Sequence, residues 1–143
     1  MRLLIDTNIF LELLHDQLKA DEARNLLSSA AGHEMFISGF ALHSIGLLLV
    51  RQGKESAFRQ FVLDMIRNAG VQVLSLPAEN MDLAFDAVAR FRLDFDDAYQ
   101  YAIAEKHGLT IVSFDVDFDR TRLGRLTAGI HSPILKRCSP LTQ

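Results

Sequence analysis

The first residues of the chain predict a strand that leads directly into a helix. Residues 3–5 are apolar and are followed by the polar residues Asp6, Thr7 and Asn8. A short apolar run bounded by polar residues is typical of a buried strand. Asp and Thr are typical N-cap residues, so we expect a helix that begins at Asp6 or Thr7.

Apolar residues at helical spacing predict further helices along the chain. One helix face spans residues 81–91, after Pro77, and the acids at residues 94–97 open another helix that ends at Gly108. Upstream, the spacing predicts a short helix at residues 23–30, a very apolar helix at residues 40–50 and an amphipathic helix at residues 57–66.

Three more apolar runs predict strands between these helices, at residues 35–37, 71–74 and 109–112. Strands that alternate with helices indicate βαβ units, and therefore an α/β fold whose mostly parallel sheet is covered on both faces. Residues 121–143 are weakly patterned, with Ile134 and Leu135 as the candidates for a last strand. In folds of this class, ligands bind beyond the carboxyl ends of the strands.

The composition narrows the class of protein. Its 143 residues fit a single domain, 1–143, and the content of 49% hydrophobic and 23% charged residues excludes a disordered or fibrous chain. The net charge of −3 supplies no overall positive field. Any contact with nucleic acid must therefore be local.

Three features favour a cytoplasmic protein. The single Cys138 leaves no partner for an intramolecular disulfide and no set of thiolates for zinc. Asp6 comes too early for a signal peptide, and no run approaches the roughly 20 apolar residues that cross a bilayer. We therefore expect a protein of the reducing cytoplasm with no membrane partner.

Acidic residues stand at the expected ligand-binding edge of the sheet. Asp6 ends the first strand, Asp97 begins a helix, and Asp115 and Asp117 follow the strand at residues 109–112. Asp also caps helices and begins turns, so the prediction depends on the whole set. Unpaired carboxylates at one edge repel one another, which suggests a hard cation such as Mg²⁺ or Mn²⁺. Such a cation favours phosphodiester hydrolysis.

These residues resemble the PIN domain family, and especially the VapC-like toxins of toxin–antitoxin pairs. The matching segments are residues 3–8, Asp97 and Ala98 at a helix start, and residues 109–118. Each segment is short, but their order and spacing together cover nearly the whole chain.

The resemblance implies a three-layer α/β/α sandwich and a Mg²⁺- or Mn²⁺-dependent endoribonuclease. It implies that the acids Asp6, Asp97 and Asp115, and often Asp117, hold the metal. It also implies that Thr7 matches a hydroxyl residue that supports the site. The partners it implies are RNA, a small antitoxin protein and a second copy of the chain.

One position departs from the pattern of the family, which usually carries a Glu in the helix after the second strand. When Ser38 is aligned with the family's Ser, that Glu falls at Ser44. Ser supplies no carboxylate, and His43 and Asp94 are candidates to compensate. Mg²⁺ needs only one or two direct carboxylates, so the remaining acids should still bind it. Because one carboxylate is missing, we expect the binding to be weak and the cleavage of single-stranded RNA to be slow and favoured by Mn²⁺. The alternative is a PIN-like binding module with little or no nuclease activity.

Two groups of residues are candidates for contacts with partners. Arg120, Arg122 and Arg125 follow the last acids and could contact RNA phosphates, although a solvated basic loop explains them almost as well. Apolar residues of the N-terminal helices could face an antitoxin or a second copy, because one core has limited room for them. These residues are Phe10, Leu13, Leu14, Leu26 and Leu27.

Overall fold

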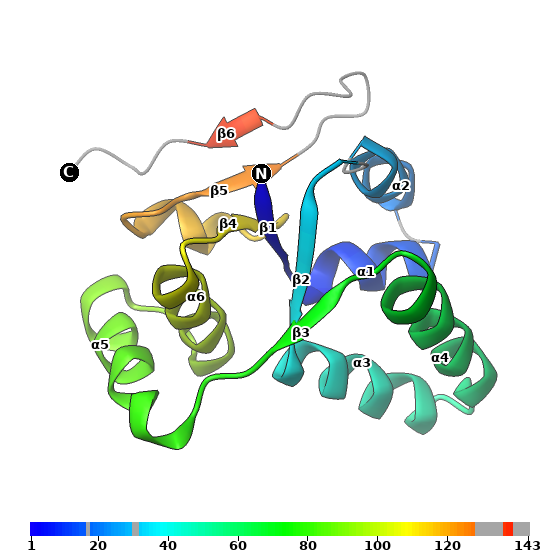
Figure 1. The fold of residues 1–143 in the computed structure, drawn as a ribbon, viewed down its shortest axis with the longest axis horizontal. Coiled ribbons are helices and arrows are strands. Elements are labelled where there is room, and N and C mark those ends of the chain that lie inside the picture. The colour runs from blue at the N-terminus through cyan, green and yellow to red at the C-terminus, as the bar shows by residue number, and fades with distance from the viewer. Residues whose placement is uncertain (17, 30–31, 128–135, 139–143) are drawn as a thin grey trace.

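A six-stranded sheet runs through the middle of the protein (Figure 1). The computed structural model describes residues 1–16, 18–29, 32–127 and 136–138. Its strand order is β3-β2-β1-β4-β5-β6, in which every neighbouring pair is parallel except the antiparallel pair β5 and β6. The prediction of a mostly parallel sheet is therefore confirmed. The strands are β1 Arg2–Ile5, β2 Glu34–Ser38, β3 Gln72–Leu74, β4 Thr110–Val112, β5 Arg125–Thr127 and β6 Lys136–Cys138.

Helices cover both faces of the sheet, which confirms the three-layer α/β/α sandwich. Leu3 and Ile5 of β1 pack in a core with residues of α1, α2, α3 and α4, whereas Leu4 packs in a second core with residues of α5 and α6. Successive strand residues point to opposite faces, so one strand serves both cores. The α-helices are α1 Thr7–Leu14, α2 Ala20–Ser29, α3 Gly39–Arg51, α4 Glu55–Phe61, α5 Met81–Phe91 and α6 Phe95–His107.

The order of the strands places a crevice at the end of β1. The chain moves outward from β1 through β2 to β3, and then returns through α5 and α6 to form β4 on the other side of β1. This reversal beside β1 is the position where open α/β sheets bind ligands. Ile5 is opposite Val112 in the register, so Asp6 and Ser113 leave the sheet side by side.

The predicted helix at residues 57–66 differs in detail from the observed one. The α-helix α4 continues as a π-helix over Val62–Asn68, in which the N–H of Ala69 donates to the carbonyl of Asp64. The helix α3 packs closely on α4, since a Cβ built at Gly46 would lie 2.7 Å from the ring of Phe58. A side chain at this position therefore requires the ring of Phe58 to shift.

The end of the chain was the least well predicted part. The sequence analysis missed β5, a strand of three residues that begins with a buried arginine and has no alternating pattern. The predicted strand at Ile134 and Leu135 lies outside the described residues, and β6 is the last strand that the structure describes. Short 3-10 helices precede α5 and β5, at Ala78–Asn80 (η2) and Val116–Arg120 (η3).

The N-terminal helices are more deeply packed than the sequence suggested. Phe10 is fully buried, and its ring meets the ring of Phe61 edge to face at a centroid distance of 5.1 Å. The prediction that Phe10 faces a partner is therefore wrong. Leu13, Leu14 and Leu27 are half-buried against the same core, and the side chain of Leu26 lies outside the described part of the chain.

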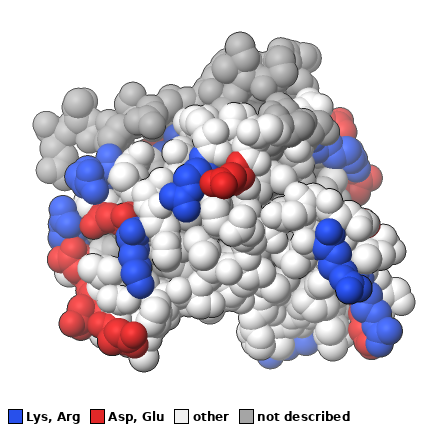
Figure 2. Space-filling view, in the orientation of Figure 1, with Lys and Arg blue, Asp and Glu red and all other residues white. Residues whose placement is uncertain are grey.

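On the face shown in Figure 2, the Lys and Arg side chains of the described residues lie among Asp and Glu side chains and do not form one broad patch. Among the helices that the structure describes, none is long and apolar enough to cross a membrane.

Candidate active site

An open pocket of about 230 Å³ lies at the carboxyl edge of the sheet, beside the end of β1. Asp6 follows β1 and caps α1, Asp97 lies in the first turn of α6, and Asp115 caps η3. Three different elements thus bring acids to one place. The pocket is lined by Asp6, Thr7, Asn8, Leu11, Phe40, Ser44, Asp96, Asp97, Gln100 and Asp115.

Three carboxylates converge within reach of a single ion. One carboxylate oxygen from each of Asp97, Asp115 and Asp117 lies within 4.8 Å of the other two, and all three side chains are half-buried. Asp6 lines the same pocket but is not part of this group, and only 4% of it is exposed. Asp6 is therefore more deeply buried than the three converging acids.

Asp6 is held by hydrogen bonds from three different parts of the chain. The backbone N–H of Thr7 and the side-chain Nε2 of Gln100 both donate to its Oδ1 at 2.7 Å, and the Ser113 hydroxyl donates to its Oδ2 at 2.6 Å. Burial raises the pKa of Asp6, and these three hydrogen bonds oppose the rise. The donors around this carboxylate therefore offset part of the cost of burying it, and its pKa remains raised.

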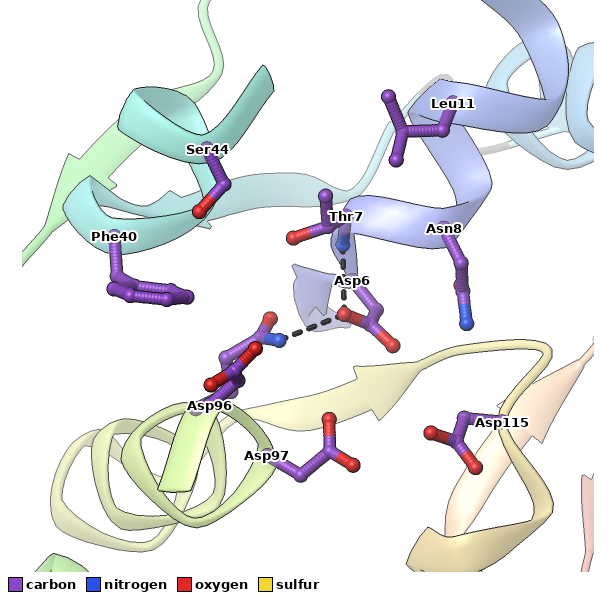
Figure 3. Close-up of a pocket in the computed structure, with 10 residues that line it drawn as sticks. Asp6, Thr7, Asn8, Leu11, Phe40, Ser44, Asp96, Asp97 and Asp115 are labelled. Carbon is purple, nitrogen blue, oxygen red and sulfur yellow. Dashed lines mark hydrogen bonds between the residues drawn. The ribbon is translucent and has the colours of Figure 1, made fainter. Parts of the chain in front are cut away.

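The main influences on the pKa of Asp97 all raise it, whereas hydrogen bonds lower that of Asp6. Burial, followed by the charges of Asp6 and Asp115, raises its pKa to about 8. In Figure 3 the carboxyl of Asp97 points toward the space between Asp6 and Asp115. This part of the pocket lacks a positive charge, which either a proton or a cation would supply.

Ser113 connects Asp6 to the loop that carries the other acids. Its hydroxyl accepts from the backbone N–H of Asp115 at 2.9 Å and from Nδ2 of Asn8 at 3.3 Å. The backbone N–H of Asp117 in turn donates to Oδ1 of Asp115 at 2.8 Å. The positions of Asp6, Asp115 and Asp117 are thus linked by a chain of hydrogen bonds.

A buried arginine supports this loop from behind. The Nη1 of Arg125 donates to the carbonyl of Ser113 at 3.1 Å, and its Nε and Nη2 donate to the two carboxylate oxygens of Asp119 at 3.0 and 3.3 Å. The Arg125 side chain is 9% exposed and the Asp119 side chain 18% exposed. Both oxygens of Asp119 are used, so this ion pair has a fixed geometry.

The predicted supporting residues fall into two groups. Ser44 and Thr7 line the pocket, and Figure 3 shows both of them above Asp6. Asp94 is the N-cap of α6 and is exposed, and His43 is exposed on α3; neither lines the pocket. The acid beside Asp97 that does line it is Asp96.

Three arginines were predicted to contact RNA, and the prediction is wrong for Arg125, which is buried in its ion pair with Asp119. The other two also contact groups of the protein itself. Arg120 donates to the carbonyls of Phe91 and Arg92 and pairs with Asp117 at 2.7 Å. Arg122 lies 3.6 Å from Glu105. Neither lines the pocket, and their contact with RNA stays a prediction.

The sequence pattern did not identify Gln100 and Ser113, two polar residues that are distant from Asp6 in sequence and donate hydrogen bonds to it. Gln100 lies one helical turn after Asp97, so both residues share one face of α6 and line the pocket. The position of Ser113 follows from the pairing of β1 with β4. The helical spacing was visible in the sequence, whereas the pairing of these two strands was not.

The comparison with known sequences identifies the family. A sequence profile of the PIN domain matches residues 3–123, which is most of the chain. No curated protein matches the chain by sequence.

Solved structures support the same assignment of the fold. VapC20 of Mycobacterium tuberculosis, described as a sarcin–ricin loop cleaving toxin, is 21% identical with a TM-score of 0.74, over 87% of this chain and 98% of that one. VapBC2 of Rickettsia felis, bound to a DNA fragment from its promoter, is 15% identical with a TM-score of 0.70, over 85% and 94%.

A toxin–antitoxin complex from Klebsiella pneumoniae is 18% identical with a TM-score of 0.61, over 80% of this chain and 88% of that one. At these identities, the likeness shows a shared fold. The profile match covers β1, α6, β4 and the acids at their ends, which are the segments that resembled the family in the sequence. The chain belongs to the PIN domain family.

Proposed function

We propose that this protein is a Mg²⁺- or Mn²⁺-dependent endoribonuclease that cleaves single-stranded RNA as the toxin of a toxin–antitoxin pair. The observation that carries the proposal is the convergence of Asp97, Asp115 and Asp117 beside an open pocket, which Asp6, Asp97 and Asp115 line. The likeness to a toxin described as cleaving the sarcin–ricin loop supports RNA as the substrate.

The residues present fit a hard divalent cation. All the converging ligand atoms are carboxylate oxygens, which Mg²⁺ and Mn²⁺ prefer. Burial and the charges of Asp6 and Asp115 raise the pKa of Asp97, and a bound cation would offset the repulsion between these acids. Asp97, Asp115 and Asp117 would hold the cation, and Asp6 would add a further acceptor. When bound, the cation supplies positive charge that stabilises the developing charge on a phosphodiester.

The protein itself contributes a rigid frame around these acids. Ser113 fixes the position of Asp115 relative to Asp6, and Arg125 fixes Ser113. Leu11 and Phe40 form apolar walls of the pocket, and such walls exclude water from one side of a bound phosphate. Ser44 offers a hydroxyl at the place where the family pattern has Glu, so the pocket carries one negative charge fewer.

The partners and setting follow from the same proposal. Two similar structures are described as toxin–antitoxin assemblies, which supports a small antitoxin as the partner of this chain. We also propose that residues 1–143 form a single PIN-like domain, that the chain associates as a homodimer, and that it is located in the cytoplasm. Arg122 is the better placed of the two predicted RNA contacts, because its side chain is 62% exposed.

The direct test is RNA cleavage with and without Mn²⁺. We expect slow, Mn²⁺-dependent endonucleolytic cleavage by the wild type, and none by Asp6→Asn. Asp82→Asn is the matched control, since Asp82 is an exposed acid of α5 that does not line the pocket. If neither the wild type nor Ser44→Glu shows metal-dependent cleavage, the binding-module alternative replaces the nuclease.

A further inference from the structure

Gln100 is a buried amide that lies against the acids of the pocket. It is 3% exposed, lines the pocket from α6, and donates from Nε2 to Oδ1 of Asp6 at 2.7 Å. We propose that Gln100 is a positioning residue, which holds the Asp6 carboxylate in the one orientation that leaves an Asp6 oxygen facing the cation. This inference rests on the cation site of the proposed function.

Counting acceptor positions on Asp6 shows why one oxygen is left over. An ionised carboxylate has about four acceptor positions, two on each oxygen. Oδ1 uses both of its positions for Thr7 and Gln100, whereas Oδ2 uses one for Ser113. Figure 3 shows the two dashed bonds ending on the same oxygen of Asp6, while the other oxygen lies on the side of Asp97 and Asp115. Oδ2 therefore keeps one free position on the side of the other acids.

The amide of Gln100 adds a third donor that restricts the rotation of the carboxylate. The terminal torsion of Asp is broad, so a carboxylate with fewer donors samples more than one orientation. Thr7 and Ser113 each donate from segments adjoining β1 or β4, whereas Gln100 donates from α6, the helix that also carries Asp97. Gln100 therefore fixes Asp6 relative to α6, and so relative to Asp97 on the same helix.

A neutral side chain suits this position better than an acid. Gln100 stands one turn from Asp97 on the same helix face, and a carboxylate there would add a further like charge next to Asp6. The pocket thus surrounds Asp6 with neutral donors, and it also has a neutral Ser44 where the family pattern has Glu. With fewer acids to attract a cation, the orientation of each remaining acceptor matters more.

The first experiment measures Mn²⁺ binding directly, from the electron paramagnetic resonance signal of free Mn²⁺. Gln100→Leu keeps the approximate size of the side chain and removes the donor. We expect its Mn²⁺ affinity to fall about 10- to 100-fold, the usual effect of removing a residue that orients a metal ligand. Gln60→Leu is the matched control, because Gln60 also donates from Nε2 to an Asp Oδ1, that of Asp64 at 2.8 Å, but on an exposed surface. It should leave the affinity unchanged.

A second experiment uses the wild type and needs no variant to fold. In a ¹H–¹⁵N spectrum, the side-chain NH₂ of Gln100 should shift as Mg²⁺ is added, and the NH₂ of Gln60 should not. A folded Gln100→Leu with wild-type Mn²⁺ affinity, or a Gln100 NH₂ signal that ignores Mg²⁺, would overturn the proposal.

The outcomes also separate this inference from the proposed function. A wild type that binds Mn²⁺ with help from Gln100 but cleaves no RNA supports the role of Gln100 and contradicts the nuclease. A nuclease whose Mn²⁺ affinity is the same with Leu at position 100 contradicts only the role of Gln100. A wild type that binds no Mn²⁺ overturns both.

Discussion

Asp6 and Asp97 line the same pocket, but the protein surrounds them in opposite ways. Asp6 is almost fully buried and receives hydrogen bonds from Thr7, Gln100 and Ser113. Asp97 is half-buried, and its surroundings, with Asp6 and Asp115 nearby, raise its pKa to about 8. The two acids therefore have different roles. The protein holds Asp6 in place with hydrogen bonds, whereas the charge of Asp97 is left for a ligand to neutralise.

The largest effect on stability should come from breaking the frame at Arg125. Arg125→Met leaves Asp119 without its partner and Ser113 without support, and loss of one partner of a buried ion pair costs about 3–5 kcal/mol. Arg90→Met is the control, since its pair with Asp86 is exposed and such pairs contribute about 0–1 kcal/mol. Urea denaturation measures both. Equal losses in the two variants would show that the buried pair does not support the loop.

Replacing each of the two acids by Asn should change the stability of the fold in opposite directions. Asp6→Asn turns an NH₂ group toward a Ser113 hydroxyl that already accepts two hydrogen bonds. Removal of the buried charge offsets part of this cost, so we expect the free energy of unfolding to fall by about 1 kcal/mol. Asp97→Asn removes repulsion and should raise the melting temperature in the absence of cations. A thermal melt in EDTA compares them. A change of the same sign in both variants would contradict the comparison.

The contribution of Asp97 to the pH dependence of stability should appear as a difference between the wild type and Asp97→Asn, since Asp6, whose pKa is also raised, is present in both. The pKa of Asp97 is about 8 in the folded protein and about 3.9 in an unfolded chain, so between these values the folded state holds a proton that the unfolded state has lost. Stability contributed by this group is therefore present at low pH and falls as the pH rises from about 4 to about 8.

Melting temperatures at several pH values without cations check this sign. The wild type should lose more stability than Asp97→Asn as the pH rises, and added Mn²⁺ should reduce the difference at high pH. Asp82→Asn should follow the wild type, because Asp82 is exposed and lies outside the pocket. Parallel curves for the wild type and Asp97→Asn would mean that Asp97 is already ionised.

The part of the fold that depends on local pattern was predictable from the sequence. The apolar run of β1, the polar residues after it and the Gly108 end of α6 are local signals, and each element is found where it was expected. The strand β5 is held by its neighbours and by the Arg125 ion pair, not by a pattern of its own. Nothing local to that segment could have predicted it.

The candidate site shows the same division. Sequence order places Asp6, Asp97 and Asp115 at one edge, because each follows a strand or begins a helix. It could not show that Gln100 donates to Asp6, a contact across 94 positions of sequence. Nor could it show that Asp96 lines the pocket beside Asp97, whereas Asp94, the N-cap of α6, does not. Contacts that depend on packing are visible only in three dimensions.

The smallest effect is expected from a further carboxylate in the pocket, introduced at position 44. Ser44 lines the pocket from α3, so Ser44→Glu adds a charge to the same pocket that Asp97 lines. Even in high dielectric, one more charge contributes about 1 kcal/mol toward a nearby cation, or about fivefold in Mn²⁺ affinity. We expect slightly faster RNA cleavage and, without cations, a lower melting temperature. His43→Glu adds the same charge on the same helix but outside the pocket, so it should do neither. If both variants raise cleavage equally, a general electrostatic effect explains the gain, and position 44 has no direct part in holding the cation.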